Sequence, residues 1–235
     1  MQAVILAGGL ATRLRPLTAE IPKSLIQVLD KPFFEYQLDF LKKGGVEDIV
    51  LCVGYLGEQI ENYLVDGKRL GMNITYSEEV EQLLGTAGAL RQAKSLLDDH
   101  FFVINGDTYL PIDYKRVERC FLTRRKKGLM VVYDGRENVG ISNNVGLNDN
   151  LMVVKHSKRN SNASLKYVDV GVSVFRREAV DDITGQYPIS LEIGLYPSLI
   201  EQGELAGYVT GQRFYDIGTP EQLKTFEKYL RKELR

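Results

Sequence analysis

The first half of the chain alternates short apolar runs with segments whose apolar residues recur at helical spacing. Three apolar runs predict buried strands of a parallel sheet, over residues 3–7, 49–54 and 101–105. Three segments predict helices, over residues 32–43, 56–64 and 86–97. Pro32 suits the first turn of the first helix, and Gly44 and Gly45 end it. This strand–helix–strand repetition predicts a parallel sheet covered by helices on both faces.

The second half is richer in short β-type segments separated by polar stretches. It predicts strands over residues 129–133, 145–147, 152–154, 167–175, 207–210 and 214–217. We expect the first four of these to form an antiparallel, substrate-facing elaboration of the sheet. Helices are predicted over residues 192–202 and from about Pro220 to the end. Since no linker is long enough to separate independent units, we expect one domain over residues 1–235.

Composition narrows the class of protein without naming its chemistry. The 235 residues carry a formal net charge of −1, which gives no electrostatic case for nucleic acid or an anionic membrane surface. No segment approaches the ~20 apolar residues of a membrane span, and Met1 leads into a core strand rather than a signal peptide. The two cysteines, Cys52 and Cys120, form no disulfide framework. We expect a cytoplasmic protein.

The first predicted strand runs into two glycines followed by fixed cations. Gly8 and Gly9 precede Arg13 and Arg15, and Lys23 follows after a turn. Glycine lets backbone N–H groups approach an anion, and the cations neutralise its charge, so this loop predicts a phosphate site. The spacing is neither that of a Rossmann fingerprint nor that of a P-loop. The alternative is a tight turn with solvated arginines.

Two aspartates each follow a predicted strand. Asp107 comes after Asn105-Gly106, and Asp216 comes after Phe214-Tyr215. In sheets of this kind, ligands bind beyond the carboxyl ends of the strands. Two carboxylates at that edge suit Mg²⁺, which also takes phosphate oxygens and water. The alternative for each aspartate is a turn former or a helix cap.

A longer pattern contains these residues. Residues 6–18 read Leu-Ala-Gly-Gly-Leu-Ala-Thr-Arg-Leu-Arg-Pro-Leu-Thr and are followed by Pro22-Lys23. This resembles the signature of the sugar-1-phosphate nucleotidylyltransferases. The resemblance continues in order through four more segments, at residues 31–32, 84–89, 105–107 and 216–220. Among the family's branches, the chain most resembles the short mannose-1-phosphate and heptose-1-phosphate guanylyltransferases.

The resemblance implies a fold and a reaction. It implies a Rossmann-like, three-layer α/β nucleotidyltransferase fold with a mainly parallel sheet and a small antiparallel sugar-binding elaboration. Residues 1–128 would mainly bind the nucleotide, and residues 129–235 the sugar phosphate. The partners would be an NTP and a sugar 1-phosphate, giving a nucleotide sugar for cell-surface polysaccharide. Relatives often form dimers or tetramers, so a homo-oligomer is one expectation.

The residues agree with that chemistry. A sugar-phosphate oxygen attacks the α-phosphorus and pyrophosphate leaves; since the nucleophile is already an anion, no general base is needed. The chain has only two histidines and no Ser-His-Asp or Cys-His set. Two alternatives stay open: a uridylyl-, thymidylyl- or cytidylyltransferase of the same fold, acting on a sugar phosphate or phosphocholine, and a catalytically silent nucleotide-sugar sensor.

The resemblance also assigns roles. Arg13 would clamp the β- and γ-phosphates, Lys23 would bridge the α-phosphate and the sugar phosphate, and both aspartates would hold Mg²⁺. The catalytic set would be Arg13, Lys23 and Asp107. The nucleotide would be bound by Leu6, Ala7, Gly8, Gly9, Leu10, Ala11, Thr12, Arg13, Glu79, Gly85, Thr86 and Asp107. The sugar phosphate would be bound by Lys23, Gly146, Lys158, Asp169 and Gly171.

The residues before Leu84 bear on the choice of base. Guanine presents two N–H donors, which a carboxylate accepts well, whereas uracil and thymine suit an amide. Glu79 or Glu81 therefore favours GTP, although Gln82 is close by. The structural alternative is an acidic loop before a capped helix.

Three positions depart from the family's pattern. Ala11 stands where the family has Gly; if that position needs a positive φ, Ala costs about 1 kcal/mol or shifts the loop. Ser157 replaces a Glu before Lys158, which makes a solvated loop lysine the alternative for Lys158. Asp169 replaces an Asn that would contact sugar hydroxyls. These changes bear on the sugar more than on the reaction.

Overall fold

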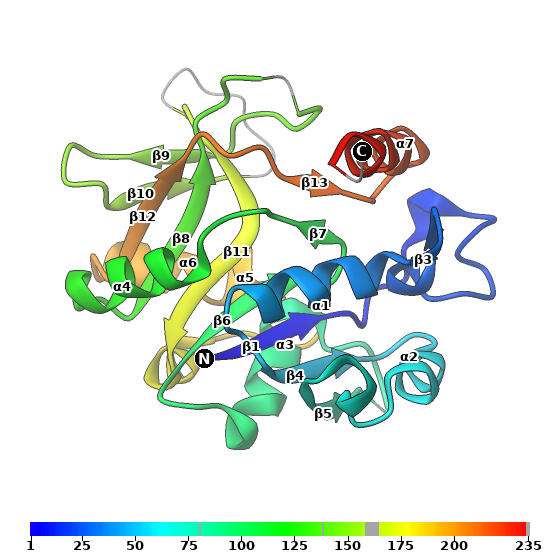
Figure 1. The fold of residues 1–235 in the computed structure, drawn as a ribbon. Coiled ribbons are helices and arrows are strands. Elements are labelled where there is room, and N and C mark those ends of the chain that lie inside the picture. The colour runs from blue at the N-terminus through cyan, green and yellow to red at the C-terminus, as the bar shows by residue number, and fades with distance from the viewer. Residues whose placement is uncertain (80, 138, 158–164, 234–235) are drawn as a thin grey trace.

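The computed structural model describes residues 1–79, 81–137, 139–157 and 165–233, and a large sheet runs through it (Figure 1). The seven strands of this sheet are β1 (Gln2–Leu6), β4 (Asp48–Val53), β5 (Asn73–Glu78), β6 (His100–Asn105), β8 (Gly128–Tyr133), β11 (Val168–Arg176) and β12 (Leu205–Thr210). Three two-stranded sheets lie outside it: β2 (Gln27–Val28) with β3 (Lys31–Pro32), β7 (Thr108–Tyr109) with β13 (Tyr215–Asp216), and β9 (Val145–Leu147) with β10 (Val153–His156).

Helices connect the strands. The α-helices are α1 (Phe33–Lys43), α2 (Gly57–Leu64), α3 (Gly85–Gln92), α4 (Tyr114–Arg124), α5 (Leu191–Gly194), α6 (Tyr196–Glu201) and α7 (Pro220–Glu233). Short 3₁₀ helices are η1 (Thr12–Leu14), η2 (Lys23–Leu25), η3 (Lys68–Leu70), η4 (Ala93–Leu96) and η5 (Arg177–Asp182). Every helix in these described segments is too short or too polar to cross a bilayer.

The strand order of the central sheet is β12-β8-β11-β6-β1-β4-β5. Strands β6, β1, β4 and β5 are parallel, as are β12 and β8, whereas β11 runs antiparallel to both of its neighbours. The predicted mainly parallel sheet with small antiparallel additions is therefore confirmed. Both halves of the chain contribute strands to this one sheet, and the β9–β10 hairpin extends from it.

Helices cover both faces of the sheet because each has an apolar stripe at helical spacing. In α1, Phe34, Leu38 and Leu41 are buried and pack with residues of α2 and α4 against one face. On the other face, Leu90 of α3 and Leu199 of α6 belong to a second buried cluster. The sheet is therefore covered by helices on both faces, as predicted.

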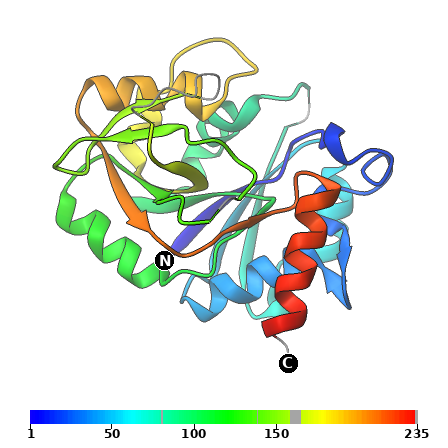
Figure 2. The ribbon, with the colours of Figure 1, turned by 90° about the horizontal axis from the view of Figure 1, so that it is seen from above.

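The C-terminal helix closes the arrangement. Phe226 of α7 packs edge-on against Phe33 and Tyr36 of α1, with ring centroids 5.2 and 5.9 Å apart. Helix α7 therefore lies beside α1, although the two helices are far apart in the sequence (Figure 2). Since β13 immediately precedes α7, this aromatic packing brings Asp216 back to the carboxyl edge of the sheet.

Some predicted elements differ from the structure. The helix predicted over 192–202 is divided into α5 and α6, because Leu195 leaves helical geometry (φ −126°, ψ −52°) and Pro197 has no N–H for a continuous helix. The helix predicted over 86–97 ends as α3 at Gln92 and continues as η4. Pro32 caps α1 rather than occupying its first turn.

Candidate active site

The glycine loop after β1 passes very close to two neighbouring segments. A Cβ atom on Gly8 would lie 2.6 Å from Oε1 of Glu79, at the end of β5. A Cβ on Gly106 would lie 2.9 Å from the carbonyl oxygen of Leu6. At Gly106 a larger residue would meet the backbone of β1 and push the strand ends apart, whereas at Gly8 it would displace the Glu79 carboxylate.

Ala11 adopts the left-handed conformation, with φ 48° and ψ 38°, as the residue that caps η1. Its carbonyl oxygen accepts hydrogen bonds from the Leu14 N–H (3.1 Å) and the Thr18 hydroxyl (2.8 Å). The loop therefore keeps a conformation that glycine adopts easily, and the alanine carries the backbone strain.

We expect Ala11→Gly to raise the free energy of unfolding by up to about 1 kcal/mol. The left-handed conformation costs alanine about 1–2 kcal/mol, and part of the gain is offset by the greater freedom of glycine in the unfolded chain. Denaturant unfolding measures the change. The matched control is Ala19→Gly in the same exposed loop, where φ is not positive and a small loss is expected. A loss of stability in Ala11→Gly would contradict the conclusion that Ala11 carries backbone strain.

A lysine and two carboxylates meet at this edge. Lys23, at the start of η2, forms an ion pair with Asp107, and their side chains are 14% and 30% exposed. Asp107 and Asp216 come together because β7 and β13 pair with Thr108 opposite Asp216. The Ile217 N–H also donates to the Asp107 carbonyl oxygen (3.1 Å).

Asp216 is held in one orientation. Its Oδ1 accepts from the Gly218 N–H (2.5 Å) and its Oδ2 from Nε2 of Gln222 (2.8 Å). Burial, followed by the negative charge of Asp107, raises the pKa of Asp216, and Lys23 and Arg13 oppose that shift. Arg13 reaches the same place, with Nη2 3.0 Å from where a Cβ on Gly218 would lie. Two carboxylates and two cations therefore share this edge.

This donor set fits Mg²⁺. The ion prefers oxygen ligands and takes one or two carboxylates, completing its coordination with substrate phosphates and water. Asp107 and Asp216 supply such a pair, and each oxygen of Asp216 keeps a lone pair beyond its hydrogen bond. Within the described segments, no group of three or more His, Cys, Asp or Glu side chains is placed to hold a metal.

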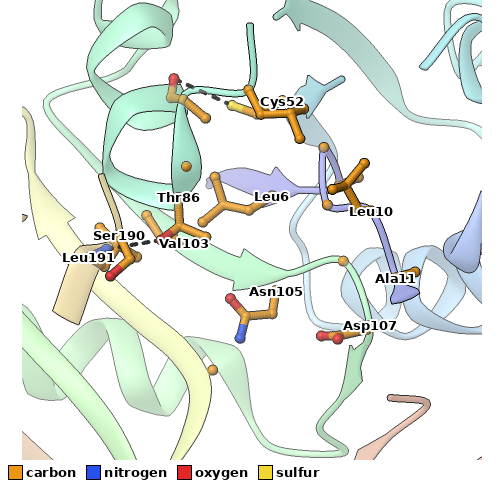
Figure 3. Close-up of a pocket in the computed structure, with 18 of the residues that line it drawn as sticks. Leu6, Leu10, Ala11, Cys52, Thr86, Val103, Asn105, Asp107, Ser190 and Leu191 are labelled. Carbon is orange, nitrogen blue, oxygen red and sulfur yellow. Dashed lines mark hydrogen bonds between the residues drawn. The ribbon is translucent and has the colours of Figure 1, made fainter. Parts of the chain in front are cut away.

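A cavity of about 640 Å³ opens beside these groups. Figure 3 shows Leu10, Ala11 and Asp107 on one side and Thr86, Ser190 and Leu191 on the other. It is lined by every residue predicted to bind nucleotide: Leu6, Ala7, Gly8, Gly9, Leu10, Ala11, Thr12, Arg13, Glu79, Gly85, Thr86 and Asp107. Lys23, Asp169 and Gly171 line it as well.

The other predicted site residues lie elsewhere. Gly146 is in the β9–β10 hairpin and is not among the described residues that line the cavity. Lys158 lies outside the described residues. Asp216 does not line the cavity either, but stands next to Asp107, which does. Glu81 and Gln82 are exposed and away from the cavity wall, so Glu79 is the acidic residue that this loop presents.

The wall opposite the phosphate loop is tightly constrained. Gly85 has φ +75°, and a Cβ there would lie 2.5 Å from the Ile189 carbonyl oxygen. The Thr86 hydroxyl accepts from the Leu191 N–H (2.9 Å), which ties α3 to α5 (Figure 3).

Glu79 accepts the Leu84 N–H through Oε2 (2.5 Å), and burial raises its pKa. Burial also raises the pKa of the Cys52 thiol to about 12, so Cys52 stays a neutral thiol, which donates to the Ala89 carbonyl oxygen (3.8 Å).

The sequence did not reveal Gln37, which holds the Asp107 loop from behind. This buried residue of α1 donates from Nε2 to the carbonyl oxygens of Asn105 (3.0 Å) and Thr108 (2.5 Å). These two residues flank Gly106 and Asp107. The signal in the sequence is a single polar residue on the buried face of an amphipathic helix, which by itself does not tell which loop it contacts.

We expect Gln37→Met to lower the free energy of unfolding by about 2 kcal/mol. The substitution keeps the side-chain volume but leaves two carbonyl oxygens without that donor in a buried environment. Urea unfolding measures the loss. The control is Gln59→Met, because Gln59 donates to the Glu20 carbonyl at the exposed surface, where about 0.5 kcal/mol or less is expected. Equal losses of stability in the two variants would refute the role of Gln37 in holding the Asp107 loop.

Comparison with known proteins identifies the family. A family model described as nucleotidyl transferase matches residues 2–233. The chain belongs to the nucleotidyl transferase family. The resemblance inferred from the sequence motifs is thereby confirmed.

Relatives in this nucleotidyl transferase family have named activities. The mannose-1-phosphate guanylyltransferase catalytic subunit beta of Drosophila melanogaster is 32% identical over 95% of this chain and 61% of its own length. The UTP–glucose-1-phosphate uridylyltransferase of Synechocystis sp. is 30% identical over 100% of this chain and 65% of its own length. The chain therefore spans less than two thirds of the length of these relatives.

Solved structures agree with the nucleotidyl transferase assignment. HddC from Yersinia pseudotuberculosis is 25% identical, with a TM-score of 0.84 over 97% of this chain and 99% of its own. The same protein complexed with GMP-PN gives a TM-score of 0.83 over the same shares. The predicted three-layer α/β fold is confirmed by this likeness over nearly the whole of both chains.

Proposed function

We propose that this chain couples a nucleoside triphosphate to a sugar 1-phosphate of the mannose or heptose type, giving a nucleotide sugar and pyrophosphate. The observation that carries the proposal is the meeting of Arg13, Lys23, Asp107 and Asp216 beside one cavity. Two cations and two carboxylates at the end of a glycine loop match the needs of a triphosphate with its metal.

The reaction needs alignment and charge neutralisation more than proton transfer. An oxygen of the sugar phosphate attacks the α-phosphorus in line, the bond from that phosphorus to the bridging oxygen breaks, and its electron pair leaves with pyrophosphate. Arg13 would hold the β- and γ-phosphates. Lys23 would leave Asp107 to contact the α-phosphate and the sugar phosphate. Mg²⁺, held by Asp107 and Asp216, would neutralise phosphate charge.

GTP is the first candidate for the nucleotide. Glu79 lines the cavity, and its Oε1 faces the glycine loop while Oε2 is held by the Leu84 N–H. A carboxylate there suits the N1 and N2 donors of guanine. The guanylyltransferase relatives and the GMP-PN complex of HddC support the same choice.

The test is pyrophosphate release with Mg²⁺ from each of GTP, ATP, CTP, UTP and dTTP, paired with a panel of sugar 1-phosphates. We expect turnover with GTP and with mannose or heptose 1-phosphate. No turnover with any pair would overturn the proposed reaction. A preference for UTP would favour the second candidate, a uridylyltransferase, to which the Synechocystis relative points.

A further inference from the structure

A buried histidine stands behind the cavity and has no part in the reaction proposed above. His156 is the last residue of β10, and its side chain is 3% exposed. It does not line the cavity, but Asp169 of β11, which does, lies directly in front of it. The Nε2 atom of His156 is 3.1 Å from Oδ2 of Asp169.

The carboxylate of Asp169 is fixed from two sides. Its Oδ1 accepts the Gly171 N–H (2.9 Å) and its Oδ2 contacts Nε2 of His156, while the backbone N–H of Asp169 donates to Oδ1 of Asn144 (2.8 Å). Because an ionised carboxylate only accepts hydrogen bonds, the contact with His156 requires the proton on Nε2 of the histidine. Each oxygen of Asp169 keeps a lone pair beyond these contacts, and Asp169 is among the residues that line the cavity.

The imidazole ring is itself held in place. Tyr196 of α6 packs edge-on against it, with ring centroids 5.0 Å apart at 67°. Tyr196 is buried, and burial raises its pKa well above 10, so it stays a neutral phenol. His156, Asp169 and Tyr196 are thus in contact with one another through the imidazole ring. Of these three residues, Asp169 and Tyr196 line the cavity.

We propose that His156 is a positioning residue for sugar recognition, holding Asp169 as a fixed acceptor for a ring hydroxyl of the sugar 1-phosphate. This inference rests on the proposed function. The cavity is divided between a phosphate-binding side, with Arg13, Lys23 and Asp107, and a wall from the second half of the chain that includes Asp169, Ser173 and Tyr196. The sugar ring would meet the second wall, where an acceptor-only group selects a hydroxyl donor.

This arrangement defines a substrate class. A sugar with a hydroxyl opposite Asp169 would donate a hydrogen bond to the carboxylate. A deoxy sugar would instead leave the desolvated negative charge without a hydrogen-bond donor. An asparagine at this position both donates and accepts, so it selects less strictly. Asp169 and His156 together therefore restrict the sugar to one with a free hydroxyl at a particular ring position.

The experiment compares wild type with four single variants. The best wild-type substrate among mannose, glucose and heptose 1-phosphates is assayed beside its deoxy analogues. We expect one deoxy analogue to be rejected by at least about 100-fold in kcat/KM. Asp169→Asn should reduce that discrimination by at least about 10-fold while leaving the KM for GTP unchanged.

His156 is tested by two substitutions that separate packing from hydrogen bonding. His156→Phe keeps an aromatic ring against Tyr196 but removes the donor, and we expect it to raise the KM for the sugar phosphate about 10-fold. His156→Gln keeps an N–H near the position of Nε2 and should restore most of that loss. In an Asp169→Ala background, which removes the acceptor that Nε2 contacts, His156→Phe should change the sugar KM less than twofold, because the two residues act as one unit.

The outcomes separate this inference from the proposed function. A wild type without turnover on any pair refutes the reaction, and the inference with it. If the wild type is active, any of three results overturns the inference alone: the Phe and Gln variants lose equally, the Phe variant shifts the KM values for GTP and sugar alike, or the effects of His156→Phe and Asp169→Ala simply add. Thermal unfolding of each variant shows whether the comparison is between folded proteins.

Discussion

Replacing Asp107 with asparagine is expected to lower kcat/KM with Mg²⁺ by at least about 1,000-fold, which corresponds to about 4 kcal/mol of transition-state stabilisation. The substitution keeps the shape of the side chain and removes the negative charge that would bind the metal. It also leaves the Lys23 ammonium without its ion-pair partner. Pyrophosphate release measures the activity, and the affinity for Mn²⁺, measured by its electron paramagnetic resonance signal, reports on the metal site directly.

The same variant should stay folded. The negative charges of Asp107 and Asp216 repel each other. Removing the charge of Asp107 removes this repulsion, which offsets the stability lost with the Lys23 ion pair. Asp39→Asn is the matched control, because Asp39 forms an ion pair with Lys31 on the surface of α1, outside the cavity. It should keep full activity. Wild-type activity in D107N, or an equal loss in D39N, would rule out the metal-binding role of Asp107.

The sequence predicts this edge well because its chemistry is local. Gly8, Gly9 and Asp107 follow strands whose apolar runs are unmistakable, and parallel strands end at a common edge. The position of Ala11 is similar: the family pattern has glycine there, and the structure has φ 48°. A backbone conformation of this kind depends on the residue type at a single position, so it can be predicted without the tertiary structure.

Elements whose stability comes from tertiary packing were harder to predict. Strand β5 was not predicted because its alternating sequence, with Asn73 and Thr75 exposed, is polar overall and gains stability only as an edge strand beside β4. Helix α4 was not predicted either. Its buried residues, Tyr114, Val117 and Phe121, are few among charged neighbours.

The residues that orient the site residues from behind also could not be predicted from local sequence patterns. Gln37 reaches the Asp107 loop from a helix 68 residues earlier than Asn105. His156 of β10 meets Asp169 of β11 where Tyr196 of α6 packs against the imidazole ring. Such pairs depend on distances between segments remote in sequence, so one sequence predicts the residues that touch the phosphates better than the residues that orient them.

Replacing Glu79 with glutamine is expected to lower kcat/KM for GTP by about 100-fold and to narrow the preference for GTP over UTP. The Leu84 N–H needs an acceptor, so the amide oxygen would take that contact and the NH₂ group would turn toward Gly8 and the cavity. A donor would then face the N1 and N2 donors of guanine. Uracil places carbonyl oxygens there, which the NH₂ group can pair. Initial rates with the two nucleotides measure the ratio.

The pH dependence of KM for GTP supplies an independent readout. In the proposed complex, ionised Glu79 would accept the guanine donors through Oε1, whereas protonation would place a competing O–H donor on the carboxyl group. Burial raises the pKa of Glu79 above the usual value of a glutamate. Protonation therefore weakens GTP binding, so KM should rise as pH falls from neutral toward that raised pKa, and Glu79→Gln should lack this dependence. The matched control is Glu81→Gln, since Glu81 is exposed and outside the cavity wall. If E81Q rather than E79Q changed both the base preference and the pH profile, Glu79 would not be the residue that reads the base.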